Sequence, residues 1–284
     1  MPLTTYYEVR PWARAIKEQI LERRMPKWHA ARGFGAFSND PSLTPLESAL
    51  IVSWVDGGQP PGSAPGDLTT PLPPPPAATA FRRAADRVLT IPPEVASVSA
   101  PARAQWISGW NFEPGDPLIT SATFSSASGG IGTWVAGDQP VVLSAGSGLR
   151  VSGAIQVNLH RRPPADFEAA AAPQASVLRL RVTGPPARHV WQEEVGCNIP
   201  RQPPDGAGPM RSVNVLAVRP MLDARASARI WLQRPGAPAT IIGWFRDFEP
   251  AFSRTYWLAR SVELSPDSRL QADAGCTMQL TLSR

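Results

Sequence analysis

Three histidines, two cysteines and five methionines are the side chains in this chain of 284 residues best suited to hold a transition metal. The histidines are His29, His160 and His189, and three imidazoles are the usual minimum for a catalytic zinc site. No two of them have the i, i+2 or i, i+4 spacing that brings imidazoles together on a strand or a helix. A structural or solvent-facing role is therefore the simpler interpretation of each histidine.

Nucleophilic and acid–base catalysis are not indicated either. The chain has no G-x-S-x-G sequence, and Cys197 and Cys276 have no basic residue beside them. The two cysteines could form one disulfide, which would fit an exported protein, or they could be two buried thiols. Asp247, Glu249 and Asp273 could form acid–base pairs, but charged surface residues are the simpler interpretation.

Two further segments have residue types that could bind a cofactor. Gly129-Gly130-Ile131-Gly132 is rich in glycine, but no lysine follows it and no strand–helix–strand pattern surrounds it, so a loop is predicted and not a phosphate site. Met25 follows an amphipathic segment and precedes a loop and another helical segment. The methionine whose sulfur is the axial haem ligand of a mono-haem cytochrome has the same position. A methionine that fills a gap in a core is the alternative.

Composition limits the class of protein. The 33 prolines and 22 glycines argue against a mainly helical chain and favour short strands with many loops. Basic residues exceed acidic ones by 28 − 23 = 5, but the arginines are scattered, so nucleic-acid binding is not expected. No apolar run is long enough to span a membrane, and the N-terminus has no signal-peptide pattern.

Two helices are predicted in the first 58 residues. The first covers residues 4–28, where Thr5 and Glu8 form a capping box. The second starts at the cap Thr44 and ends at Gly57. Its predicted apolar face consists of Leu46, Leu50, Ile51 and Trp54.

The remainder of the chain predicts a proline-rich linker over residues 59–83 and then strands. Apolar residues recur with a period of two, separated by turn residues about every ten positions. The predicted strands are 88–91, 155–159, 177–182, 213–218, 228–232, 240–244 and 278–282. We therefore predict a mainly β chain, with two β-sandwich, jelly-roll-like domains at 84–165 and 166–284 after a small helical segment at 1–58.

Four segments of the helical part carry a family resemblance. They are Arg10–Ile16, Arg24–Ala30, Phe37–Asp40 and Trp54–Gly58. Together they resemble the second half of a small c-type cytochrome domain that large secreted bacterial proteins carry fused to a copper type II, ascorbate-dependent monooxygenase-like module. The resemblance implies that Met25 is the axial haem ligand. In that family the haem-attaching C-x-x-C-H lies upstream of the segment that matches Met1-Pro2-Leu3. Either Met1 is therefore internal to an extended protein that carries haem c, or the haem half has been lost.

The β part resembles the copper module of that family, which is similar to peptidylglycine hydroxylating monooxygenase. The matching segments are Trp110–Gly115, Gly132–Gly137, Ile155–His160, Gly196–Pro200, Arg219–Met221 and Trp244–Leu264. Most copper ligands of the family are missing at the matching positions. Thr120 and Ser121 replace one histidine pair, and Pro220-Met221-Leu222-Asp223 replaces a Pro-His-Met-His motif. The resemblance leaves His160 and Met278 as vestigial copper ligands.

These observations lead to three expectations about function. The first is a catalytically silent scaffold or binding protein, periplasmic or secreted, with an unknown protein or redox partner and without copper. The second is an exported mono-haem electron-transfer protein, if a C-x-x-C-H precedes Met1. The third is a working copper-dependent monooxygenase, which would need ligands outside the family pattern, because a lone imidazole binds copper too weakly.

Overall fold

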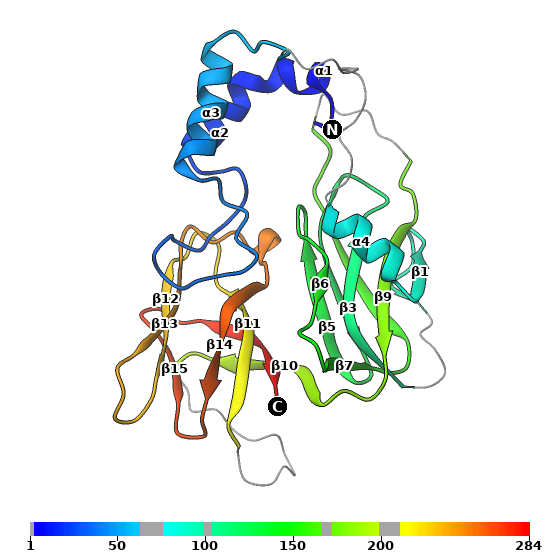
Figure 1. Ribbon diagram of the computed structural model, residues 1–284, viewed down its shortest axis with the longest axis vertical. Helices are drawn as coiled ribbons and strands as arrows, with labels where there is room; N and C mark the ends of the chain where they lie inside the picture. The colour runs from blue at the N-terminus through cyan, green and yellow to red at the C-terminus, as the bar shows by residue number, and fades with distance from the viewer. Residues whose placement is uncertain (1–2, 63–75, 99–103, 166–171, 199–210) are drawn as a thin grey trace. The chain divides into compact units, whose positions relative to one another are not determined.

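The computed structural model describes residues 3–62, 76–98, 104–165, 172–198 and 211–284. They fall into two compact units (Figure 1). The helical unit comprises the described parts of residues 1–28 and 40–76, and the β unit comprises residues 29–39 and the described parts of 77–284. The chain is mainly β, as predicted, and its α-helices all precede the first strand in the described residues.

The first predicted helix of the helical unit is present but shorter and divided. Its elements are α1 (Tyr6–Val9), the 3-10 helix η1 (Arg10–Trp12) and α2 (Ala13–Leu21). The capping box is confirmed, because the Thr5 hydroxyl accepts from the backbone N–H of Glu8 and the Glu8 carboxylate accepts from that of Thr5. The helix ends at Leu21, and Arg23 has a positive φ of 57°, which a continuing helix does not allow.

Helix α3 (Pro45–Asp56) begins and ends where the sequence predicts. Thr44 and Glu47 form its capping box, and Gly57 is its C-cap. The predicted apolar face is not a buried face, however, because Leu46 is 69% exposed and Leu50 is 61% exposed. Helical spacing shows which residues share a face but not whether anything covers it.

The β unit contains α4 (Pro76–Ala84) and three sheets. The largest sheet has the order β1-β9-β3-β7-β10-β16-β11-β14, with β6 paired to β3; the others are β2-β8-β4-β5 and β13-β12-β15. The strands are β1 (Arg87–Ile91), β2 (Ser97–Val98), β3 (Gln105–Glu113), β4 (Ile119–Ser126), β5 (Gly129–Val135), β6 (Val141–Val142), β7 (Ser147–Val151), β8 (Ile155–Arg161), β9 (Ser176–Thr183), β10 (Arg188–Gly196), β11 (Val213–Met221), β12 (Ala228–Gln233), β13 (Thr240–Phe245), β14 (Tyr256–Leu264), β15 (Arg269–Ala272) and β16 (Thr277–Ser283).

Each end of the largest sheet forms one layer of a sandwich. In the first sandwich, β1, β9, β3 and β7 share a core with the four-stranded sheet. That core includes Ile107, Phe112, Phe124, Ile155, Val157, Leu178 and Leu180. In the second, the rings of Phe245 of β13 and Tyr256 of β14 meet at 4.7 Å between the two layers, and both are fully buried.

The two sandwiches share the largest sheet without a break, because β7 pairs in parallel with β10. Strand β9 pairs with β1 and β3, so the first sandwich takes a strand from beyond residue 165, where the sequence predicts a domain boundary. Strand periodicity does not reveal this, since it specifies which face of a strand is buried but not which strand lies beside it.

Residues 76–84 form a helix and not the end of an extended linker. The alanine-rich run is a good helix former, and Phe81 anchors it with 3% exposure. A Cβ atom at Gly109 of β3 would lie 2.4 Å from the carbonyl oxygen of Val141 and 3.1 Å from the Phe81 ring, so the glycine leaves space for both. The predicted linker residues 63–75 lie outside the described residues.

The predicted loop at Gly129–Gly132 is also wrong, because these residues begin strand β5. A Cβ atom at Gly132 would lie 2.3 Å from Cζ2 of Trp110, and one at Gly130 would lie 2.1 Å from Oε1 of Gln192. The glycines therefore let large side chains lie directly on the strand, which is a common reason for glycine inside a sheet.

Residues 29–39, here called the strap, connect the two halves of the helical unit but belong to the β unit. The strap follows the free edges of β13 and β14. The N–H of Ala31 donates to the carbonyl of Trp244 at 2.7 Å, and the N–H of Ser38 donates to that of Trp257 at 2.8 Å. Because these strands end their sheets, the strap covers edges that would otherwise be open to pairing.

Candidate functional site

The structure does not gather the residues that the sequence singles out as ligands. Met25 lies in the helical unit, His160 in β8 of the four-stranded sheet, and Met278 in β16 of the largest sheet. Over the described residues, no group of three or more histidine, cysteine, aspartate or glutamate side chains could hold a metal ion.

His160 and Met278 occupy unlike environments. Ile155 and Val157 of β8 face the core, so His160, an odd number of residues further along, lies on the opposite face and is exposed. Met278 is fully buried, as is Leu282 on the same face of its strand, so it belongs to the core of the second sandwich. An exposed imidazole and a core thioether do not fit copper, which needs several ligands on one ion.

Met25 lies at the surface, after α2. Its side chain is 42% exposed, so the alternative of a core methionine is wrong. Its backbone N–H donates to the carbonyl of Gln19 at 3.2 Å, which holds the turn against the helix end. The residues of this chain do not fit a covalently attached haem, because they include no C-x-x-C-H.

The other histidines have structural surroundings. His29 in the strap is 9% exposed; its Nδ1 lies 3.3 Å from the Tyr256 hydroxyl and its ring lies 5.1 Å from that of Phe248. His189 is exposed, and its ring lies 4.6 Å from that of Trp106. These contacts agree with the interpretation of structural or solvent-facing histidines.

The contact between the two sandwiches contains a buried ion pair that sequence analysis missed. Nε of Arg254 lies 3.2 Å from Oδ1 of Asp138, and its guanidinium donates to the carbonyl of Ala136 at 3.1 Å. Arg254 is 4% exposed. Burial raises the pKa of Asp138 to about 6, although the charge of Arg254 and the N–H of Val135 both favour the carboxylate. No sequence signal pairs these residues, because they come from loops far apart in the chain.

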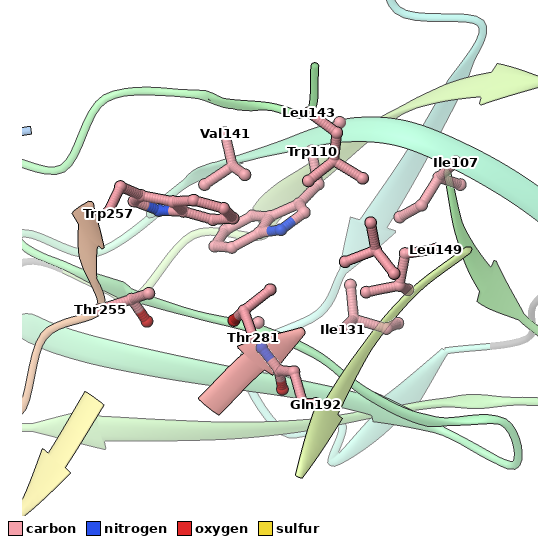
Figure 2. A pocket seen from close by; sticks show the side chains of 13 residues that line it. Ile107, Trp110, Ile131, Val141, Leu143, Leu149, Gln192, Thr255, Trp257 and Thr281 are labelled. Carbon is pink, nitrogen blue, oxygen red and sulfur yellow. The ribbon is translucent and has the colours of Figure 1, made fainter. Parts of the chain in front are cut away.

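Beside this ion pair, aromatic and polar side chains line a small cavity. The indoles of Trp110 and Trp257 lie on one side of it, and the hydroxyls of Thr255 and Thr281 lie on the other (Figure 2). Trp110 belongs to the first sandwich and the other three residues to the second. The cavity volume is about 20 Å³, too small for an organic substrate.

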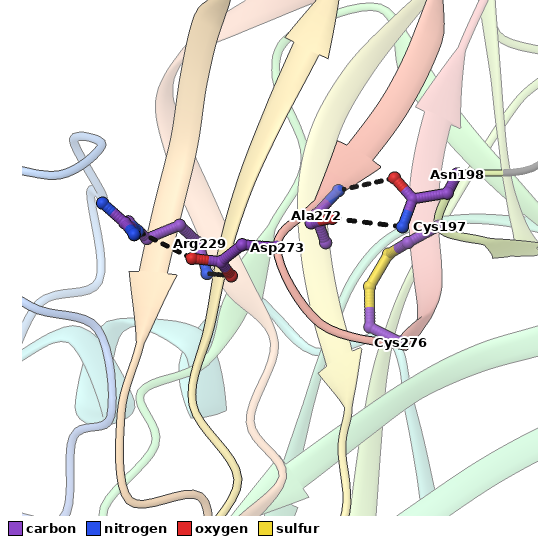
Figure 3. Close-up of a disulfide and its surroundings, with 6 residues drawn as sticks. All are labelled: Cys197, Asn198, Arg229, Ala272, Asp273 and Cys276. Carbon is purple, nitrogen blue, oxygen red and sulfur yellow. Dashed lines mark hydrogen bonds and ion pairs between the residues drawn. A yellow bond between two sulfur atoms is a disulfide. The ribbon is translucent and has the colours of Figure 1, made fainter.

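The open question about the cysteines is resolved by a disulfide between Cys197 and Cys276 (Figure 3). Next to it, Asn198 closes the edge of β15. Its amide donates to the carbonyl of Ala272 at 3.1 Å, and its amide oxygen accepts from the N–H of Ala272 at 3.0 Å. The N–H of Asn198 also donates to the carbonyl of Leu270 at 2.9 Å. This side of the second sandwich is thus tied covalently and by hydrogen bonds.

The helical unit has a groove of about 690 Å³ between α2 and the end of α3. Its lining residues are Arg14, Lys17, Glu18, Leu21, Glu22, Val55, Asp56, Gly58 and Gln59. Leu21 is 60% exposed there, while Lys17 pairs with Asp56 across the helices. The groove therefore combines apolar surface with charges of both signs.

Comparisons with known proteins give no family and no activity. No family model matches the chain, and no curated protein matches it. Among solved structures, the major capsid protein P2 from bacteriophage PM2 matches with 12% identity and a TM-score of 0.32, over 69% of this chain and 96% of that chain. At that TM-score the match supports no inference about this protein. No helix in the described residues is long and apolar enough to cross a membrane.

Proposed function

We propose that this chain is a scaffold or binding protein without catalytic chemistry, derived from the cytochrome-linked, copper monooxygenase-like family that its sequence resembles. In this proposal the helical unit binds a partner protein and the two sandwiches form the rigid support. The disulfide supports a periplasmic or secreted location, since such bonds persist in oxidising compartments.

The observation that carries the proposal is the surface of the helical unit. Six of the ten large apolar side chains that are exposed in the described residues belong to it, and they are Leu3, Tyr7, Leu21, Met25, Leu46 and Leu50. Only Ala13 and Val55 are buried among its described residues. Leu46 and Leu50 are one turn apart on α3, so they share one face. A shared exposed apolar face such as that of Leu46 and Leu50 is characteristic of interaction sites.

A photo-crosslinking amino acid placed at Leu50 in the native host tests this proposal. We expect a discrete adduct with a protein, and its loss when Leu46→Glu is added. The matched control is the same crosslinker at Val142, which is 56% exposed in the β unit and is expected to give no such adduct. The proposal fails if position 50 gives no adduct, or if the purified protein holds stoichiometric copper, which would favour the monooxygenase.

The second candidate is an exported mono-haem electron-transfer protein. The exposure of Met25 favours it, because an exposed thioether is available to an external iron. Intact mass and a visible spectrum of the protein from its own cells decide between the candidates. An added upstream segment with a covalent haem, and a spectrum that Met25→Leu shifts, would favour electron transfer. A haem-free protein of 30.5 kDa would exclude it.

A further inference from the structure

The cavity between the sandwiches has the size and the chemistry of a site for one water molecule. Its volume of about 20 Å³ slightly exceeds the roughly 10–15 Å³ that a single water needs. Most of its walls are apolar, including Ile107, Ile131, Val141, Leu149 and Val190. An apolar cavity of this size stays dry, so its polar lining decides whether water enters.

Three polar side chains face the cavity from the second sandwich. They are Gln192 of β10, Thr281 of β16 and Thr255 just before β14 (Figure 2). Thr281 is 4% exposed and Thr255 is 8% exposed. Within the part of the chain that the structure describes, no other residue forms a hydrogen bond with these three side chains. A water usually makes two to four hydrogen bonds in such a site, and these three side chains supply the polar groups for them.

The fold fixes these groups in place. Gln192 and Thr281 are direct cross-strand neighbours, on the face of the largest sheet opposite to the buried Leu280 and Leu282. Gly130 leaves space for the Gln192 amide, since a Cβ there would lie 2.1 Å from its Oε1. The site therefore depends on both sandwiches.

Asn39 of the strap holds the remaining wall. Its side-chain oxygen accepts from the N–H of Trp257 at 2.9 Å, and its amide donates to the carbonyl of Thr255 at 2.8 Å. Both residues line the cavity, Trp257 with its indole and Thr255 with its hydroxyl. The strap thus positions the segment that closes the site.

We propose that this cavity is a binding site for a single long-lived water molecule, hydrogen-bonded by Gln192, Thr255 and Thr281 beneath the indoles of Trp110 and Trp257. The water acts as an internal ligand that joins the polar face of the second sandwich to the first. The side-chain oxygens of Gln192, Thr255 and Thr281 below two indoles are also suitable ligands for a monovalent cation, and the experiment distinguishes the two occupants.

Deuteron relaxation dispersion of solvent water, measured on the full chain, counts long-lived internal waters. We expect the dispersion amplitude of Thr281→Val to fall by the contribution of one water, because valine keeps the shape of threonine and removes the hydroxyl. Thr123→Val, a substitution of the same type on β4 away from the cavity, should match the wild type. Equal amplitudes in all three proteins would overturn the proposal.

A crystal structure of the wild type provides a test that does not depend on a variant. We expect one density peak of water size within hydrogen-bonding distance of Gln192, Thr255 and Thr281. Crystals grown with rubidium chloride should show no anomalous peak there. An anomalous rubidium peak would show that a cation occupies the site and not a water. A cavity without density would exclude both occupants.

Discussion

Asp138 is the acidic residue whose protonation the fold alters most clearly. Its pKa is about 6 in the folded chain, against an ordinary value of 3.8. Between these values the folded state keeps a proton that the unfolded state has lost. The resulting stabilisation is fully present below about pH 4 and is lost as the pH rises through about 6.

The pH dependence of Asp138→Asn tests this directly. We expect the wild type to lose up to about 3 kcal/mol of unfolding free energy between pH 4 and 7 from this residue, and the variant to lack this component. In the variant Arg254 has no charged partner at any pH, as in the protonated wild type below about pH 6, so this contact gives the variant no pH dependence. Urea denaturation at several pH values measures both effects. Identical slopes in the two proteins would contradict the raised pKa.

Gly132 illustrates what residue types alone do not reveal. Three glycines in four residues predict a loop, yet the close approach of Trp110 requires one of them within a strand. Gly132→Ala should therefore cost about 1–3 kcal/mol of stability through overpacking. Gly275→Ala is the control, because a Cβ there meets nothing within 4 Å, and it should leave the thermal midpoint nearly unchanged. Equal midpoints for both variants would show that the indole can move aside.

Among the elements, the strap is the one that sequence patterns describe least well. Residues 28–42 have only the composition of a loop. Four of them nevertheless form hydrogen bonds with β13 or β14: His29, Ala31, Ser38 and Asn39. Capping boxes and alternating strands are local patterns, so they could be predicted. The contacts of the strap, the pairing of β9 with β1 and β3, and the ion pair of Asp138 with Arg254 all join residues that are distant in the sequence. No local pattern specifies such partners.

Asn39→Ala measures how much the strap contributes. The change removes the hydrogen bond from the N–H of Trp257 in β14 and the one to the carbonyl of Thr255 just before β14, and should destabilise the chain by about 1–3 kcal/mol. Ser38→Ala is a milder control, since the Ser38 hydroxyl makes a longer bond of 3.3 Å at an exposed position. Thermal denaturation should show the larger loss for Asn39→Ala. Equal midpoints for Asn39→Ala and the wild type would mean that the strap is held by its backbone hydrogen bonds alone.

The disulfide stabilises the second sandwich by closing a long loop. Its cysteines are separated by 79 positions, for which loop entropy predicts roughly 4 kcal/mol. Cys197→Ser with Cys276→Ser should therefore lower the denaturation midpoint strongly, and a reducing agent should have the same effect on the wild type but none on the variant. A wild type that is insensitive to reduction would show that Asn198 closes this edge without the covalent bond.

For the whole molecule, the two units differ in how much structure supports them. The β unit has two cores, a shared sheet, a strap and a disulfide, whereas the helical unit buries Ala13 and Val55 in its described residues. Free energies of local opening follow the amount of buried apolar surface. We therefore expect α3 to exchange its amide hydrogens much faster than β16, with only the β16 amides reaching the protection of global unfolding. Hydrogen exchange with mass spectrometry on the full chain measures this.

If a partner covers Leu46 and Leu50, its addition should slow exchange in α3 and leave β16 unchanged. Protection of α3 equal to that of β16 in the isolated chain would mean that the helical unit already has a cover, and the exposed leucines would then no longer support a binding surface.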